Sequence, residues 1–130
     1  MSRKSKGINA ERELIHLFWK EGWAAIRIAG SGAIKYPCPD VLAGNIKRRI
    51  AIECKASKSS SQYLTKDEVE QLKQFSSIFG AEPWIGVRFN NAKWMFLSLE
   101  DLKETSENYV VSASDANLRG ISFEELTKKS

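Results

Sequence analysis

The sequence predicts an α/β domain with a mixed central β-sheet flanked by helices. Apolar residues recur at helical spacing in two segments, residues 10–20 and 65–79, and β-patterned runs lie between and after them. Turn signals at residues 44–45 and 90–91 join two pairs of these runs, which favours hairpins. With 130 residues, 42% of them hydrophobic, the chain is long enough for one domain but not for two.

The first half begins with a predicted amphipathic helix over residues 10–20, capped at its N-terminus by Asn9. Leu14, Leu17 and Phe18 form the apolar stripe of this helix. The further elements expected here are a strand at residues 23–28, a loop containing Gly and Pro at residues 29–39, and a hairpin of strands at residues 40–43 and 48–55.

The second half opens with a polar stretch at residues 57–61, predicted to be a mobile surface loop. Thr65 and Glu68 form the capping-box signature of a helix that ends at Phe79, before Gly80. The remaining expected elements are two neighbouring strands at residues 84–89 and 93–99, a short strand at residues 109–112, and a last short helix capped by Ser122 and Glu125.

Charge is distributed unevenly along the chain. The formal net charge is +4, but residues 1–60 carry 12 Lys/Arg against 5 Asp/Glu, whereas residues 61–130 carry 8 against 11. The first half is therefore +7 and the second half −3. Such a basic half is typical of a protein that binds a polyanion. Modest basicity is also common in proteins that bind no nucleic acid, so this alternative stays open.

Cysteine number and hydropathy restrict the class of protein. Cys38 and Cys54 are too few for a disulfide framework, and no apolar stretch has the length of a membrane span. The basic N-terminus is not followed by the apolar segment of a secretion signal. We therefore expect a cytoplasmic location and no membrane partner. Cys54 is predicted to be a small buried thiol, and the single histidine, His16, a helix residue at the surface or partly buried.

Glu53 and Lys55 are the leading candidates for a functional site. Because strand side chains alternate, both point to the same face of their predicted strand. Asp40, at the start of the preceding strand, would place a second carboxylate beside them. Two acids can hold a divalent cation with a lysine next to it, which is the chemistry of metal-dependent phosphodiester cleavage. The alternative is a surface ion pair at a strand end.

Glu11 and Arg12 add a further component. Both are predicted to lie in the first turn of the helix at residues 10–20, from which they could reach the mouth of the sheet. Glu11 would then be a third oxygen ligand of the cation, and Arg12 could bind a phosphate. The alternative is that Glu11 only stabilises the helix dipole.

Four motifs and one tyrosine occur in the order and spacing of a known enzyme family. They are residues 7–14, 27–31, 39–43 and 52–55, and Tyr63. In these motifs the chain resembles the archaeal Holliday junction resolvases of the PD-(D/E)xK nuclease superfamily. The resemblance continues through Phe75, Phe79, Gly80 and residues 84–99. It implies a restriction-endonuclease-like nuclease core, as a single nuclease domain over residues 1–130.

The resemblance also implies a role for each matching residue. Asp40 and Glu53 correspond to metal-binding acids, and Glu11 to an acid that the first helix adds to the metal site. Lys55 corresponds to the lysine that orients or deprotonates the attacking water and stabilises charge in the transition state. Ser31 corresponds to a catalytically relevant serine of a flexible loop. The implied cofactor is Mg²⁺, and Mn²⁺ is expected to substitute for it.

Basic residues of the first half are assigned to DNA contact: Arg3, Lys4, Lys6, Arg12, Arg27 and Lys35. Arg12 and Arg27 also match family residues near the scissile phosphate. The loop between Ser31 and Asp40 is longer than the family pattern, which leaves the role of Lys35 open. Cys54 stands where the family more often has an aliphatic residue.

The implied activity is resolution of four-way DNA junctions by paired cuts in opposing strands, during homologous recombination and repair. Because such a junction has two-fold symmetry, a homodimer would bring two active sites to it. Phe75 and Phe79 are the expected dimer anchors, and a core role for the same side chains competes with this interpretation. Two alternatives remain: a related nuclease with another DNA target, and a non-catalytic DNA-binding module of the same fold.

Overall fold

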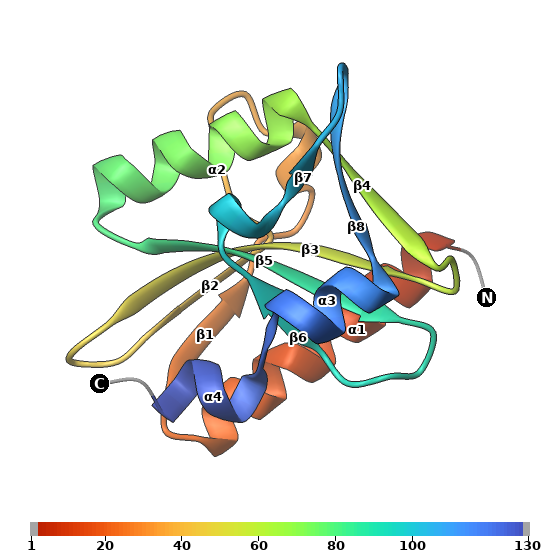
Figure 1. Cartoon of the computed structure of the whole chain (residues 1–130). Helices are drawn as coiled ribbons and strands as arrows, with labels where there is room; N and C mark the ends of the chain where they lie inside the picture. The colour runs from red at the N-terminus through yellow and green to blue at the C-terminus, as the bar shows by residue number, and fades with distance from the viewer. Residues whose placement is uncertain (1–2, 129–130) are drawn as a thin grey trace.

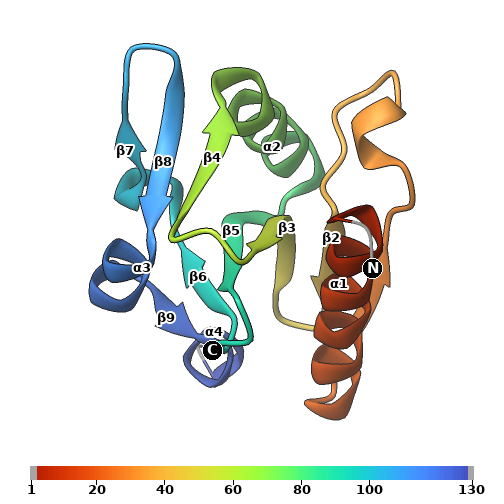
Figure 2. The same cartoon turned by 90° about the vertical axis from the view of Figure 1, so that its right-hand side faces the viewer.

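Six strands form the central sheet of the computed structural model, which describes residues 3–128 and the side-chain surroundings at residues 7–31 and 33–128. The strands are β1 (Ala24–Arg27), β2 (Val41–Gly44), β3 (Arg49–Ser57), β5 (Glu82–Phe89), β6 (Met95–Leu97) and β9 (Ile121–Ser122). Their order in the sheet is β1-β2-β3-β5-β6-β9 (Figure 1; β9 is labelled in Figure 2). β3 and β5 pair in parallel, and the other neighbouring strands are antiparallel. The predicted mixed sheet is confirmed.

A second sheet, which the sequence analysis did not predict, contains β4 (Ser61–Thr65), β8 (Asn108–Ser112) and β7 (Lys103–Glu104) in that order. The helices are α1 (Arg3–Lys20), α2 (Lys66–Phe79), α3 (Ala113–Arg119) and α4 (Phe123–Lys128), with 3₁₀ turns at η1 (Ser31–Ala33) and η2 (Leu99–Asp101). α1 and α4 cover one face of the central sheet, and α2 and the small sheet cover the other (Figures 1 and 2).

Each face of the central sheet carries its own hydrophobic core. On the face of α1, Ile50 and Ile52 of β3 pack with Leu14 and Phe18, all of them almost fully buried. On the face of α2, Ala51 packs with residues of α2 and the small sheet. This alternation continues to the end of β3, so Glu53 and Lys55 lie on the α2 face while the Cys54 side chain packs toward α1.

The start of α1 differs from the prediction. The helix begins at Arg3, so Asn9 lies inside it and is not its N-cap. Residues 3–9 contain no proline, and their single glycine, Gly7, disfavours a helix by only about 1 kcal/mol relative to alanine. As a result Glu11 and Arg12 lie in the middle of α1 and not in its first turn.

Other boundaries follow the sequence signals to different degrees. The capping box of Thr65 and Glu68 is formed, and Gly80 ends α2 with a φ of 82°, in the left-handed region that favours glycine. The predicted loop at residues 57–61 is wrong in length, because β3 extends through Ser57 and β4 already begins at Ser61. α3 was not expected, although it has its own capping box at its start.

Over residues 3–128, no helix combines the length and apolar character needed to cross a membrane.

Candidate active site

The backbone pairing of β2 with β3 brings Asp40 next to Glu53. The Asp40 N–H donates to the carbonyl oxygen of Ile52 at 3.0 Å, one residue before the ladder of β2 begins. A pocket of about 320 Å³ opens at this point. Its lining consists of Glu11, Ser31, Cys38, Asp40, Glu53, Cys54, Lys55, Glu68 and Gln71. All five residues that the sequence analysis proposed as catalytic therefore line one pocket.

Two hydrogen bonds fix the Asp40 carboxylate. Ser31 Oγ donates to Oδ1 at 2.5 Å, and the backbone N–H of Cys54 donates to Oδ2 at 2.8 Å. Ser31 belongs to η1, so the serine attaches the loop of residues 29–39 to the end of the sheet. The carboxylate is thus oriented from two sides before any ligand enters the pocket.

Glu53 is the acid whose ionisation is hardest in this pocket. Burial, the negative charge of Asp40 and the neighbouring Glu68 together raise the pKa of Glu53 to about 9, although Lys55 opposes the shift. Without a cation, Glu53 therefore carries a proton at neutral pH. A divalent cation would offset the repulsion between these carboxyls and displace that proton.

Lys55 is held by an acid that the sequence analysis did not assign to the site. Its Nζ donates to Glu68 Oε2 at 2.8 Å. Burial disfavours the charged lysine, but the hydrogen bond and charge of Glu68 outweigh burial, and the pKa of Lys55 is raised. Burial disfavours the charged form of Glu68 as well, but the bond from Lys55 outweighs it and the pKa of Glu68 is lowered. Glu68 was not predicted as a site residue, because its place in the capping box of α2 was already sufficient to explain an acidic residue there.

Glu11 enters the pocket from α1 as half of an ion pair. Arg27 Nε lies 3.2 Å from Glu11 Oε1. Burial and the charge of Asp40 raise the pKa of Glu11 to about 7, and Arg27 limits the rise. Arg12, next in sequence, is exposed on α1 and does not line the pocket.

The donor atoms fit a cation that keeps part of its water shell. In the described part of the chain, no three His, Cys, Asp or Glu side chains are gathered as a ready-made metal cluster. Asp40, just before β2, and Glu53, on the adjacent β3, nevertheless supply hard carboxylate oxygens to the same pocket. Mg²⁺ is usually bound by one or two carboxylates plus waters, which matches this pair. A metal-ligand role for Glu11 stays a prediction, because its carboxylate is paired with Arg27.

The cysteines and His16 are not arranged for catalysis. Both thiols are free, and burial together with the charge of Asp40 raises the pKa of Cys38 and, more strongly, of Cys54. Neither thiol is therefore activated as a thiolate. His16 is exposed on α1 and does not line the pocket.

Basic residues assigned to DNA contact have different surroundings. Lys35 is exposed in the long loop, with Nζ 5.8 Å from the centre of the Tyr36 ring. Arg12 is exposed as well, whereas Arg27 is mostly buried in its ion pair. The side chains of Arg3, Lys4 and Lys6 lie outside the described residues, so their assignment to DNA contact stays a prediction.

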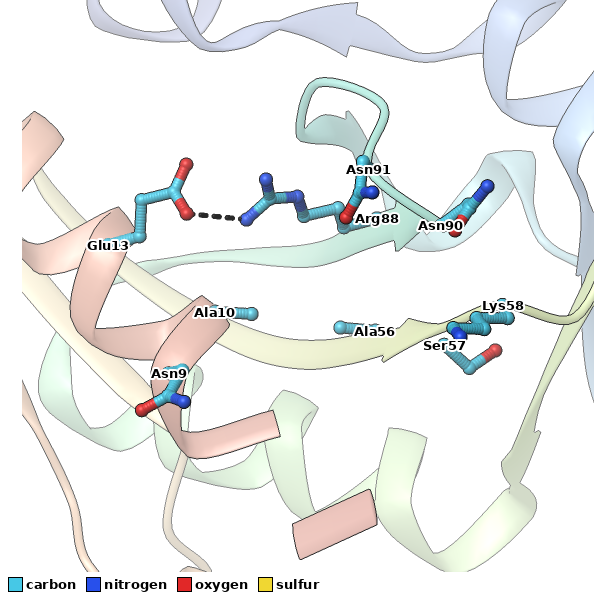
Figure 3. Close-up of a pocket in the computed structure, with 9 residues that line it drawn as sticks. All are labelled: Asn9, Ala10, Glu13, Ala56, Ser57, Lys58, Arg88, Asn90 and Asn91. Atoms are coloured by element: carbon cyan, nitrogen blue, oxygen red, sulfur yellow. Dashed lines mark hydrogen bonds and ion pairs between the residues drawn. The ribbon is translucent and has the colours of Figure 1, made fainter. Parts of the chain in front are cut away.

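A second pocket, of about 310 Å³, lies where β3 and β5 end beside α1. Figure 3 shows its lining of Asn9, Ala10, Glu13, Ala56, Ser57, Lys58, Arg88, Asn90 and Asn91. Arg88 Nη1 donates to Glu13 Oε2 at 2.7 Å across this pocket. No role for Arg88 is predictable from the sequence, because its position beside Ala56 depends on the parallel pairing of β3 with β5.

Phe75 and Phe79 both lie near the C-terminal end of α2, but they differ in exposure. Their rings stack, with centroids 5.3 Å apart, and Phe75 packs on the core beneath α2. Phe79 is 47% exposed. It lines a shallow apolar groove with Trp19, Ile26 and Leu42, which we call the apolar patch. The patch lies along β1, an edge strand of the central sheet.

Comparisons with known proteins agree on one family. The family model described as archaeal Holliday junction resolvase (Hjc) matches residues 2–130. A crossover junction endodeoxyribonuclease Hjc from Archaeoglobus fulgidus is 45% identical over 111 residues, which cover 85% of this chain and 82% of that protein. The Hjc of Methanocaldococcus jannaschii is 35% identical, with coverage of 92% and 83%. The solved structure of A. fulgidus Hjc, a Holliday junction resolvase from an archaeal hyperthermophile, matches with a TM-score of 0.86 and 40% identity, covering 96% of this chain and 98% of that one.

Proposed function

Because the chain belongs to the archaeal Holliday junction resolvase family, we propose that it resolves four-way DNA junctions with the pocket around Asp40 and Glu53. The reaction is hydrolysis of a phosphodiester bond in each of two opposing strands. The observation that carries this proposal is the convergence of Ser31, Asp40, Glu53 and Lys55 on one pocket. A binding module would have no need of this constellation.

Nucleases of this family are generally metal-dependent, and here Asp40 and Glu53 would hold the ion. We assign Mg²⁺, with Mn²⁺ as a substitute, because the donors are hard carboxylate oxygens. When bound, such an ion lowers the pKa of water and stabilises negative charge on the phosphate. Ser31 supports this role indirectly, because its hydroxyl orients the Asp40 carboxylate.

Lys55 acts in this proposal as a fixed positive charge. A lysine whose pKa is raised stays protonated at neutral pH, so it donates hydrogen bonds and does not take a proton from water. Its ammonium has three N–H donors, and one of them binds Glu68. The others are available for a phosphate oxygen or the attacking water. Charge stabilisation of this kind is among the larger contributions to catalysis.

Two opposing cuts require two active sites, and an isologous homodimer supplies them with matching symmetry. We propose the apolar patch as the dimer contact, with Phe79 as its anchor and Phe75, which packs on the core, stacked against Phe79. Trp19 and Ile26 are 58% and 57% exposed, an uncommon exposure for large apolar side chains that line one groove. Contact between two copies would cover them.

The DNA backbone is proposed to run over the basic first half of the chain. Arg12 is exposed on α1 and Lys35 is exposed in the long loop. Both elements also contribute lining residues to the pocket, Glu11 from α1 and Ser31 from the loop. Lys58, in the second pocket, adds a cation just beyond the end of β3. These contacts neutralise phosphates and read backbone geometry, so we expect selectivity for junction shape.

The decisive experiment compares a four-way junction with a linear duplex of matching sequence, each with Mg²⁺ and with a chelator. We expect paired cuts near the branch point of the junction, only with Mg²⁺, and little cutting of the duplex. Equal cutting of duplex and junction would favour a nuclease with another target. Binding without any cutting would favour the non-catalytic module.

A further inference from the structure

We propose that Glu68 is a positioning residue for the cleavage reaction, which holds the Lys55 ammonium in place at the pocket. This inference rests on the proposed function for its catalytic consequence. Its structural part, the hold on Lys55, does not depend on which DNA is cut.

Both carboxylate oxygens of Glu68 are engaged, each in a different task. Oε2 accepts from Lys55 Nζ at 2.8 Å, and Oε1 accepts from the backbone N–H of Thr65 at 2.9 Å. The second bond belongs to the capping box that starts α2. Because that bond fixes the Glu68 side chain to the helix start, the first bond fixes Lys55 to the same place.

The remaining acids of the pocket are not suited to hold Lys55. Asp40 and Glu53 are the proposed cation ligands, so a lysine paired with either would compete with the cation. Glu68 belongs to α2, which packs over β3, and it binds Lys55 while its own carboxylate adjoins Glu53. The Glu68 bond therefore keeps Lys55 beside the cation position without occupying it.

Two alternative roles of Glu68 predict different outcomes. In the first, Glu68 serves α2 alone, as half of a capping box, and its contact with Lys55 is incidental. In the second, Glu68 is a metal ligand, although both of its oxygens already accept a hydrogen bond. Side-chain exposures of 26% for Lys55 and 32% for Glu68 place the ion pair at the pocket wall, where it is partly shielded from solvent.

The test compares Glu68→Gln with Thr65→Ala. Glutamine still serves a capping box, but it loses the negative charge that holds Lys55. Thr65→Ala removes the hydroxyl that accepts the Glu68 N–H at 2.9 Å, yet leaves the Glu68 carboxylate intact. We expect Glu68→Gln to slow single-turnover cleavage at saturating junction and Mg²⁺ about 10- to 100-fold, with junction affinity within about twofold. Thr65→Ala should lower the melting temperature and keep the cleavage rate within about twofold.

A double-mutant cycle with Lys55→Ala separates positioning from a purely structural role. If Glu68 acts through Lys55, Glu68→Gln should slow cleavage little further in the Lys55→Ala background. An equal slowing in both backgrounds would overturn the proposal, as would a cleavage rate for Glu68→Gln that matches that of Thr65→Ala. A large rise in the Mg²⁺ concentration needed for half-maximal cleavage by Glu68→Gln would also overturn it, in favour of a metal ligand.

A readout without DNA tests the hold on Lys55 directly. In metal-free protein, competitive labelling with an amine-reactive reagent, followed by mass spectrometry, compares Lys55 with the exposed Lys35. Glu68→Gln should increase the relative labelling of Lys55 several-fold, and Thr65→Ala should not. Unchanged labelling overturns the hold. If the wild-type chain cut no junction, the proposed function would fail, and this labelling would still decide whether Glu68 restrains Lys55.

Discussion

Raising the pH should tighten cation binding by the metal-free protein, because the cation must displace a proton from Glu53. With a pKa of about 9, Glu53 is only about 1% ionised at pH 7 and about 9% ionised at pH 8. If only the ionised carboxylate binds the cation, the apparent dissociation constant for Mn²⁺ should fall about ninefold between these two pH values. Above pH 9 the dependence should level off.

Electron paramagnetic resonance of free Mn²⁺ measures this binding without DNA. Glu53→Gln is the matched control, since its amide does not titrate, and its weaker binding should depend much less on pH over the same range. Calorimetry in two buffers of different ionisation enthalpy should report release of nearly one proton from Glu53 per ion bound at pH 7 to wild type, and of a further fraction from Glu11, whose pKa is about 7 in the same pocket. Equal Mn²⁺ affinity at pH 7 and pH 8, with no proton released, would refute the reasoning that Glu53 is protonated in the metal-free pocket.

Four further outcomes are expected. Asp40→Asn should abolish cleavage and leave junction affinity unchanged or slightly tighter in gel-shift titrations, since no Lys or Arg that contacts phosphate is lost; wild-type cutting by this variant would remove Asp40 from the site. Lys55→Ala should slow single-turnover cleavage by about 100-fold or more, and a rate within a few-fold of wild type would make Lys55 a simple surface lysine. Phe79→Glu should give a folded monomer by light scattering and circular dichroism, because one substitution disrupts a two-fold contact twice; an unchanged dimer mass would move the interface elsewhere. Junction affinity should fall by about three orders of magnitude between ~50 and ~200 mM salt, independently of arm sequence, and a shallow slope would contradict backbone recognition.

Local sequence rules were sufficient to predict that Asp40, Glu53 and Lys55 lie together at the centre of the candidate site. Strand alternation placed Glu53 and Lys55 on one face, and a hairpin turn placed Asp40 beside them. The capping box at Thr65 fixed the start of α2 equally well. These features depend on residues within about one hairpin or one helical turn of each other, where the number of competing arrangements is small.

Features that depend on contacts between distant segments were not predictable in this way. The bond between Lys55 and Glu68 requires α2 to pack over β3, and the ion pair of Glu11 with Arg27 requires α1 to lie beside β1. The polar sequence of β4 has only a weak strand pattern, and pairing with β8 supplies the missing stabilisation. The beginning of α1 is misplaced in the prediction because Asn9 resembles an N-cap but does not interrupt a helix.

Helix α2 joins the candidate active site to the proposed dimer contact. α2 has 14 residues and a length of about 21 Å, with Glu68 in its first turn and Phe79 as its last residue. If Phe79 lies at a two-fold axis, the rigid helix α2 holds each Lys55, through Glu68, at a fixed distance from that axis. The distance between the two active sites, and so between the two cuts, is then fixed by the protein and not by the substrate. A four-way junction, whose arms can change their relative angles, must then deform at its branch point to match that distance before both strands can be cut.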